Sequence, residues 1–242
     1  MSTSTGPAGL RGPLRLYCLP HAGASASVYL RWQRALPDWI SVHPVELPGR
    51  GRRLGEAPVT HFAELVAQLA HGLEAELARP YALFGHSMGA VLAFELARSA
   101  SAQGKPPLAL FVSGTTPGFR GRSIVELEPR DDARLLSELR RLGGTRPEVF
   151  EHPELRELAL DVFRADVALC RSYRRSEGSL LGCPVHAFGG AIDHPGPEAL
   201  HEWQAHASRP ITLDVFPGGH FFVQSAEAQV LAQLTRHLRS IG

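Results

Sequence analysis

The sequence has little cysteine, almost no lysine and no excess of charge of either sign. Its three cysteines, Cys18, Cys170 and Cys183, are far apart and form no C-x-x-C pair, so neither a disulfide framework nor a zinc site is indicated. Lys105 is the only lysine, and the formal net charge is +1. A nearly neutral chain gives no reason to expect nucleic acid or an acidic membrane as its main partner.

Long apolar runs are missing as well. No stretch is long enough to span a bilayer, and the small, polar N-terminus lacks the charged and apolar regions of a signal peptide. We therefore expect a cytoplasmic, free-standing protein whose residues 1–12 form a disordered lead. Hydrophobic residues make up 44% of the 242 residues and charged residues 20%, which is typical of one globular domain with a sizeable core.

What the sequence does contain is a serine at the apex of a tight turn. Apolar residues from Tyr81 lead into Gly85-His86-Ser87-Met88-Gly89, and apolar residues at helical spacing follow as far as Leu96. A G-x-S-x-G motif between a strand and a helix is a nucleophile elbow. The glycines let strand and helix approach closely, and the helix N-terminus directs free N–H groups towards charge that develops at the serine. Ser87 is therefore the expected nucleophile.

On both sides of the elbow, strand patterns alternate with helical patterns. Strand-like runs lie at residues 14–20, 40–47, 81–84, 108–114, 184–190 and 211–216. Helical patterns lie between them at residues 28–36, 62–77, 88–103 and 197–206, and a closing one at 227–238. This alternation predicts an α/β-hydrolase fold, a mostly parallel central sheet with helices on both faces, in a single domain of residues 1–242.

The alternation breaks between about residues 115 and 179. Two helical patterns, 130–142 and 153–173, follow one another there with no strand between them. Such a helical insertion predicts a lid over an active site, because insertions at the carboxyl ends of strands carry function in open α/β sheets. Ordinary extra helices packed at the edge of the sheet are the alternative.

A serine hydroxyl needs an adjacent base, usually a histidine that a carboxylate orients. In α/β-hydrolases the carboxylate and then the histidine follow the serine along the chain, each just after a strand. Asp193 follows the strand that ends at Phe188, and His220 follows the strand that ends at Phe216. Both should reach the sheet edge where Ser87 lies, which predicts a Ser87, His220 and Asp193 triad.

Other acidic and histidine residues fit this order less well. Asp214 lies inside a strand, and Asp161 and Asp166 lie on a predicted helix of the insertion. His86 shares the elbow with Ser87, and its side chain should point away from the serine, which favours a packing role. The remaining rivals lie in the loop and helix that follow the carboxylate: His194, His201 and His206.

Backbone N–H groups are expected to form an oxyanion hole. One donor is usually the residue after the nucleophile, here Met88, and the other comes from the loop after an early strand. Residues 21–27 form a loop of small residues at that place, and Ala22 is the expected second donor. Because only the backbone takes part, the shape of this loop matters more than the side chain of Ala22.

Five segments occur in an order that is more specific than the elbow alone. They are Leu19-Pro20-His21-Ala22-Gly23, Leu47-Pro48-Gly49-Arg50, Gly85-His86-Ser87-Met88-Gly89, Phe188-Gly189-Gly190-Ala191-Ile192-Asp193 and Gly218-Gly219-His220-Phe221-Phe222. Together they resemble the type II thioesterases, discrete α/β-hydrolases that accompany polyketide synthases and nonribosomal peptide synthetases. The chain departs from this pattern at Ala24, where many members have a second glycine, and at residues 114–117, which replace an arginine-containing turn.

The resemblance implies hydrolysis of aberrant or stalled acyl groups from the phosphopantetheine arm of carrier proteins. Ser87 would be acylated, and His220 would pass the proton in each half-reaction. The implied partners are acyl or peptidyl carrier domains, and the expected enzyme is a monomer without cofactor or metal, since phosphopantetheine belongs to the substrate. A small-molecule carboxylesterase, a product-releasing thioesterase and a catalytically inactive binding module remain alternatives.

Carrier domains are usually acidic, so arginines in loops near the site entrance are candidates for docking. Their positions are Arg50, Arg52, Arg53, Arg120 and Arg122. Solvated loop charges without a partner are the alternative interpretation.

Overall fold

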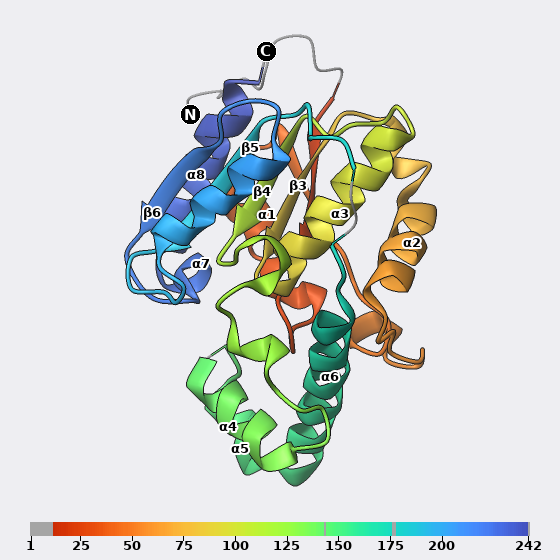
Figure 1. Ribbon diagram of the computed structural model, residues 1–242, viewed down its shortest axis with the longest axis vertical. Helices are drawn as coiled ribbons and strands as arrows, with labels where there is room; N and C mark the ends of the chain where they lie inside the picture. Colours follow the sequence, from red (N-terminus) through yellow and green to blue (C-terminus); the bar gives the residue numbers. More distant parts are fainter. Residues whose placement is uncertain (1–11, 143, 176–177, 242) are drawn as a thin grey trace.

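A single parallel sheet positions the residues of interest. The computed structural model describes residues 12–142, 144–175 and 178–241, so residues 1–11 of the expected disordered lead lie outside the described part. Within it, six parallel strands run in the order β2-β1-β3-β4-β5-β6 (Figure 1). In chain order they are β1 (Leu14–Leu19), β2 (Ile40–Pro44), β3 (Tyr81–His86), β4 (Ala109–Ser113), β5 (Val185–Gly190) and β6 (Thr212–Phe216).

Side chains of the central strands alternate between two apolar layers. In β3, Leu83 packs into one layer, whereas Ala82 and Phe84 pack into the other. The strand is buried along its whole length, as expected for a parallel strand covered on both faces. The α/β-hydrolase architecture with a mostly parallel sheet is therefore confirmed.

Helices cover both faces of the sheet. On one face lie α2 (Phe62–Leu73), α3 (Met88–Ala102) and the 3₁₀ helix η6 (Pro197–His206), and on the other lie α1 (Trp32–Ala35), α7 (Phe222–Ser225) and α8 (Glu227–Arg239). Short 3₁₀ helices occupy several connections: η1 (Ala26–Tyr29), η2 (Gly51–Arg53), η3 (Glu76–Ala78), η4 (Pro117–Phe119) and η5 (Ser123–Val125).

Three predicted helices differ from the structure. The helix expected over residues 62–77 ends as an α-helix at Leu73 and is followed by η3. The expected helix over residues 28–36 is divided into η1 and α1, and α1 ends early because Pro37 holds Leu36 in an extended conformation (φ −92°, ψ 153°). The helix over residues 197–206 has the predicted bounds, but its hydrogen bonds follow the 3₁₀ pattern throughout.

The insertion, described over residues 115–142, 144–175 and 178–179, has its α-helices grouped at one end of the molecule (Figure 1). It contains α4 (Asp132–Leu142), α5 (Pro147–Glu151) and α6 (Pro153–Ser172). The apolar spacing in the sequence predicts the two long helices, whereas α5 is too short to show a helical period. Among the described residues, no helix is long and apolar enough to cross a membrane.

Candidate active site

A cavity of about 840 Å³ lies between the carboxyl edge of the sheet and the insertion. Four of the residues expected at an active site line it: Ser87, Asp193, His220 and Ala22. The fifth, Met88, begins α3 directly after Ser87, with its side chain fully buried. Residues from separate parts of the chain therefore meet at one place. The other residues that line the cavity are His21, Gly121, Arg122, Ser123, Ile124, Glu138, Arg141, Leu142, Ile192, His194, Gly219, Phe221, Gln224 and Ser225.

Ser87 has the strained backbone conformation that an elbow requires. Its φ of 55° and ψ of −117° lie in a region that residues other than glycine rarely occupy. A Cβ atom at Gly85 would clash with the backbone of Gly89, and one at Gly89 would clash with the carbonyl of Leu19. Both glycines are required because β3, α3 and the end of β1 approach one another without room for a side chain.

His220 and Asp193 form a hydrogen-bonded pair at the edge of this cavity. His220 lies between β6 and α7, Asp193 follows β5, and Nδ1 of His220 is 3.1 Å from Oδ2 of Asp193. Since a carboxylate only accepts hydrogen bonds, Nδ1 carries the proton and Nε2 is left to exchange a proton with another group. Burial lowers the pKa of His220 below its ordinary value, although the bond to Asp193 acts in the opposite direction.

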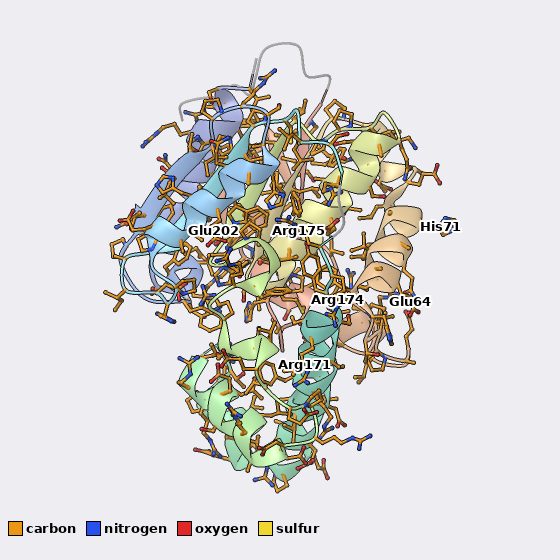
Figure 2. The ribbon with its side chains drawn as sticks, in the orientation of Figure 1. Glu64, His71, Arg171, Arg174, Arg175 and Glu202 are labelled. Atoms are coloured by element: carbon orange, nitrogen blue, oxygen red, sulfur yellow. The ribbon has the colours of Figure 1, made fainter. Side chains whose placement is uncertain are left out.

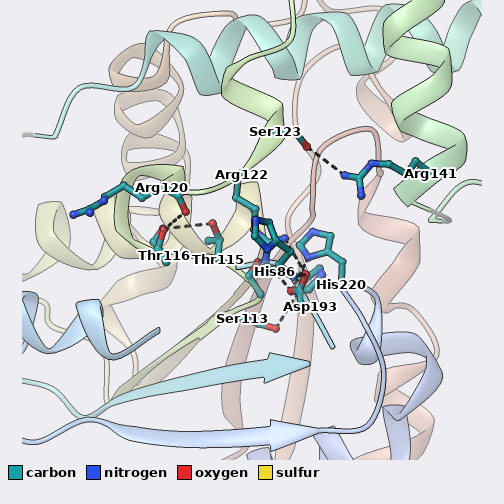
Figure 3. A network of polar contacts seen from close by, with 12 residues as sticks. His86, Ser113, Thr115, Thr116, Arg120, Arg122, Ser123, Arg141, Asp193 and His220 are labelled. Atoms are coloured by element: carbon teal, nitrogen blue, oxygen red, sulfur yellow. Dashed lines mark hydrogen bonds and ion pairs between the residues drawn. The ribbon is translucent and has the colours of Figure 1, made fainter. Parts of the chain in front are cut away.

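Arg122 holds Asp193 from the other side (Figure 3). Its Nη1 donates to Oδ1 at 3.0 Å and its Nη2 to Oδ2 at 2.7 Å, and Nη2 also donates to the carbonyl of Gly114. Burial opposes ionisation of Asp193, but the hydrogen bonds from His220 and Arg122 outweigh it and lower its pKa to about 2. The carboxylate is thus kept ionised and oriented.

Both sequence-based interpretations of Arg122, a docking residue or a solvated charge, are therefore wrong. The side chain is 10% exposed and ion-paired with Asp193. The signal that could have identified it is its place in the segment after β4, at the same edge of the sheet as Asp193. The resemblance leads one to expect an arginine in the turn that begins at Gly114. In this chain Arg122, which lies further along, donates to the carbonyl of Gly114 instead.

His86 packs against His220, and His21 in turn packs against His86. His86 is fully buried, its Nδ1 is 2.9 Å from Oγ of Ser113, and its ring lies 4.9 Å from that of His220. Burial lowers the pKa of His86 well below its ordinary value and that of His21 to about 3. Both rings therefore stay neutral beside His220, and His86 has the packing and hydrogen-bonding role that was expected of it.

The rival carboxylates are engaged elsewhere. Asp214 pairs with Nε2 of His237 on α8 at 2.7 Å, and Asp161 pairs with Arg164 on its own helix. The third rival, Asp166, is buried against the loop that contains Ala22. Asp193 is the carboxylate that reaches His220.

Arg50 also differs from its expected exposed position. It is 5% exposed, and its Nη1 and Nη2 each lie 2.6 Å from a carboxylate oxygen of Asp166. Arg50 is therefore neither a docking residue nor a solvated charge. Its partner is 116 positions away along the chain, so no local pattern could show the burial.

The insertion forms one wall of the cavity. Glu138, Arg141 and Leu142 of α4 line it together with Ser123. Arg141 donates to both carboxylate oxygens of Glu138 at 2.6 and 2.7 Å, and Ser123 donates to the same carboxylate. The position of these helices suits a lid, but opening and closing stay a prediction. Within the described ranges, no group of three or more His, Cys, Asp or Glu residues is arranged to hold a metal ion.

Comparisons with known proteins cover nearly the whole chain. The family model described as Thioesterase domain matches residues 14–241. The gramicidin S biosynthesis protein GrsT of Aneurinibacillus migulanus is 33% identical over 230 residues, which are 94% of this chain and 90% of that protein. The structure of the type II thioesterase BorB from the borrelidin biosynthetic cluster is 40% identical, with a TM-score of 0.84 and coverage of 96% and 95% of the two chains. ClbQ from the colibactin NRPS/PKS pathway is 31% identical, with a TM-score of 0.85 and coverage of 95% and 98%.

Proposed function

The chain belongs to the thioesterase family, and we propose that it removes aberrant or stalled acyl groups from phosphopantetheinyl carrier proteins of a polyketide or nonribosomal peptide assembly line. The observation that carries the proposal is the convergence of Ser87, His220 and Asp193 on one cavity. Names of its relatives support the substrate class, since BorB is a type II thioesterase of a biosynthetic cluster and ClbQ belongs to an NRPS/PKS pathway.

In the first half-reaction, Oγ of Ser87 attacks the thioester carbonyl carbon while Nε2 of His220 takes the hydroxyl proton. The N–H groups of Ala22 and Met88 stabilise the oxyanion, for which the N-terminus of α3 is suitably placed. When the C–S bond breaks, His220 returns its proton to the departing sulfur. The products are an acyl-Ser87 ester and the free thiol of the carrier arm.

In the second half-reaction, His220 removes a proton from a water molecule, which attacks the acyl-Ser87 carbonyl. The ester bond then breaks, His220 protonates Oγ of Ser87, and the carboxylic acid leaves. Asp193 stabilises the positive charge on His220 in both steps. Its pKa of about 2 keeps it ionised at neutral pH.

The shape of the cavity accommodates both ends of such a substrate. A smaller apolar pocket of about 230 Å³ shares His21, Ala22, Leu142 and Phe221 with the main cavity. We assign the acyl group to this pocket, because it lies directly behind the loop that contains Ala22. The larger opening then accepts the pantetheine arm, within the volume usual for ligand sites.

Exposed arginines offer a docking surface for an acidic carrier. Arg171, in the last turn of α6, and Arg174, just after that helix, are exposed (Figure 2). Among the arginines predicted from their loop positions, Arg52 is exposed. Arg120 is 76% exposed, with Glu202 at 3.6 Å. These residues replace Arg50 and Arg122 as docking candidates.

A substrate comparison tests the proposed activity. We expect kcat/KM for an acyl thioester on a carrier protein to exceed that for the matched oxygen ester by about tenfold or more. The same acyl group on free pantetheine should show a higher KM, because it lacks the carrier surface. A preference for the oxygen ester would instead identify a carboxylesterase, and Ser87→Ala supplies the background rate.

Replacing Arg122 by glutamine should move the acid limb of the kcat/KM profile to higher pH. Its positive charge lowers the pKa of His220, so without it His220 binds a proton at higher pH, and the protonated ring cannot act as a base. We also expect kcat at the optimum to fall by about tenfold, because Asp193 would no longer be held in the orientation that supports His220. Arg209→Gln, at an exposed arginine that neither lines the cavity nor is a docking candidate, should leave the profile unchanged. An unchanged acid limb in Arg122→Gln would contradict this role.

A further inference from the structure

We propose that Asp166 and Arg50 position the oxyanion loop, residues 20–25, so that helix α6 of the insertion sets where the N–H of Ala22 points. This inference rests on the proposed function, because it takes Ala22 as a donor to the oxyanion. Asp166 and Arg50 act through the loop and are positioning residues.

The carboxylate of Asp166 joins three parts of the chain that are far apart in sequence. Its Oδ2 accepts from the N–H of Gly23 at 2.7 Å and from Nη1 of Arg50 at 2.6 Å, and its Oδ1 accepts from Nη2 of Arg50 at 2.6 Å. Nη1 of Arg50 also donates to the carbonyl of Ala24 at 3.2 Å. The loop is therefore bound to α6 directly and through an arginine that follows β2.

The contact acts on the peptide unit next to the expected donor. Because the Ala22–Gly23 peptide is planar, the bond from the Gly23 N–H to Asp166 restricts the orientation of that whole unit. The N–H of Ala22 is joined to this peptide only through the backbone dihedral angles of Ala22. Its direction therefore depends on the position of α6. A displacement of α6 would move this donor with it.

Side chains of the insertion pack beside the same loop. Gly23 has a φ of +79°, and a Cβ atom there would lie 3.4 Å from side-chain atoms of both Leu139 on α4 and Phe163 on α6. Asp166 is fully buried and Arg50 is 5% exposed. Separating the two groups would leave each charge buried without compensation, which is strongly unfavourable, so the ion pair favours one arrangement of the loop.

Two double variants separate the loop anchor from the ion pair. Arg50→Met with Asp166→Leu removes the charges together and leaves no acceptor for Gly23. Arg50→Met with Asp166→Asn removes the same charges, but the asparagine amide oxygen can still accept from Gly23, and asparagine and leucine have nearly the same shape. We expect kcat to fall about tenfold to hundredfold in the first variant with little change in KM, and to recover in large part in the second.

The readout specific to the oxyanion is the affinity for an alkyl trifluoromethyl ketone, which forms a hemiketal anion with a serine nucleophile. In the leucine variant this affinity should fall by the same factor as kcat/KM, measured well below each unfolding midpoint. A loss of turnover with unchanged ketone affinity, or equal loss in both double variants, would overturn the proposal. Arg164→Gln, which removes an ion pair between α6 and α4, serves as the control and should change neither.

A measurement on the wild type covers the case in which the variants do not fold. The amide hydrogen of Gly23 should exchange with solvent slowly although it lies in a loop. A rate as fast as that of freely exposed loop amides would overturn the proposal. The activity assays use a short p-nitrophenyl ester, so they remain valid if carrier thioesters prove not to be substrates. Failure of the nucleophile assignment itself would be evident as turnover in Ser87→Ala.

Discussion

Replacing Ser87 by alanine should lower kcat by about 10⁴-fold to 10⁶-fold, the largest effect expected from one substitution in this chain. Without the hydroxyl no acyl-enzyme can form, so both proposed half-reactions are lost. The oxyanion donors and His220 would remain, and residual turnover would depend on water attacking the bound thioester directly. The substitution removes one partly accessible oxygen at the cavity, so folding should be preserved.

A fluorophosphonate probe measures the nucleophile directly. The wild type should gain one covalent adduct by intact mass, and Ser87→Ala should gain none. Ser99→Ala, on the same helix α3 but away from the 840 Å³ cavity, is the matched control and should label like the wild type. An adduct in Ser87→Ala would place the nucleophile elsewhere, and an unlabelled wild type would favour a binding module that keeps the fold.

Replacing His220 by alanine should lower kcat almost as much, by about 10⁴-fold or more, because members of a triad act as a unit. The change removes the base for acylation and deacylation alike. In the wild type, the pKa of His220 lies below its ordinary value of 6.5. The imidazole is neutral above that pKa, so activity should persist as the pH falls below 6.5 and be lost only when His220 becomes protonated.

The measurement is kcat/KM against pH for the wild type, with His220→Ala and His201→Ala compared at the optimum. His201, a rival histidine in the sequence, is exposed on η6, so its loss should have little effect. Substantial activity in His220→Ala, or an acid limb well above pH 6.5 in the wild type, would mean that another group acts as the base.

The elbow could be recognised from sequence because its determinants are local. A buried strand, two glycines and an apolar helix lie within one short segment, and the clashes that a Cβ would meet at Gly85 and Gly89 explain why those residues are needed. Asp193 and His220 could be placed by a second rule, since parallel strands bring their carboxyl ends to the same edge. Their hydrogen bond in the structure agrees with that placement.

The type of a helix and the presence of short helices could not be predicted from the sequence. The 3₁₀ form of η6 and the division of residues 28–36 depend on local hydrogen bonding that apolar spacing does not encode. The five residues of α5 are too few to show the apolar spacing that distinguishes a helix from a loop in a sequence.

The amino-acid sequence by itself thus determined the fold class, the elbow and the order in which serine, carboxylate and histidine reach one edge of the sheet. Only the tertiary structure decided the roles of Arg50 and Arg122. Each lies in a polar, loop-like segment, but folding buries it against a carboxylate 116 or 71 positions away. The burial of a charge depends on whether a distant partner compensates for its lost solvation, and this is a property of the packed chain that no local pattern contains.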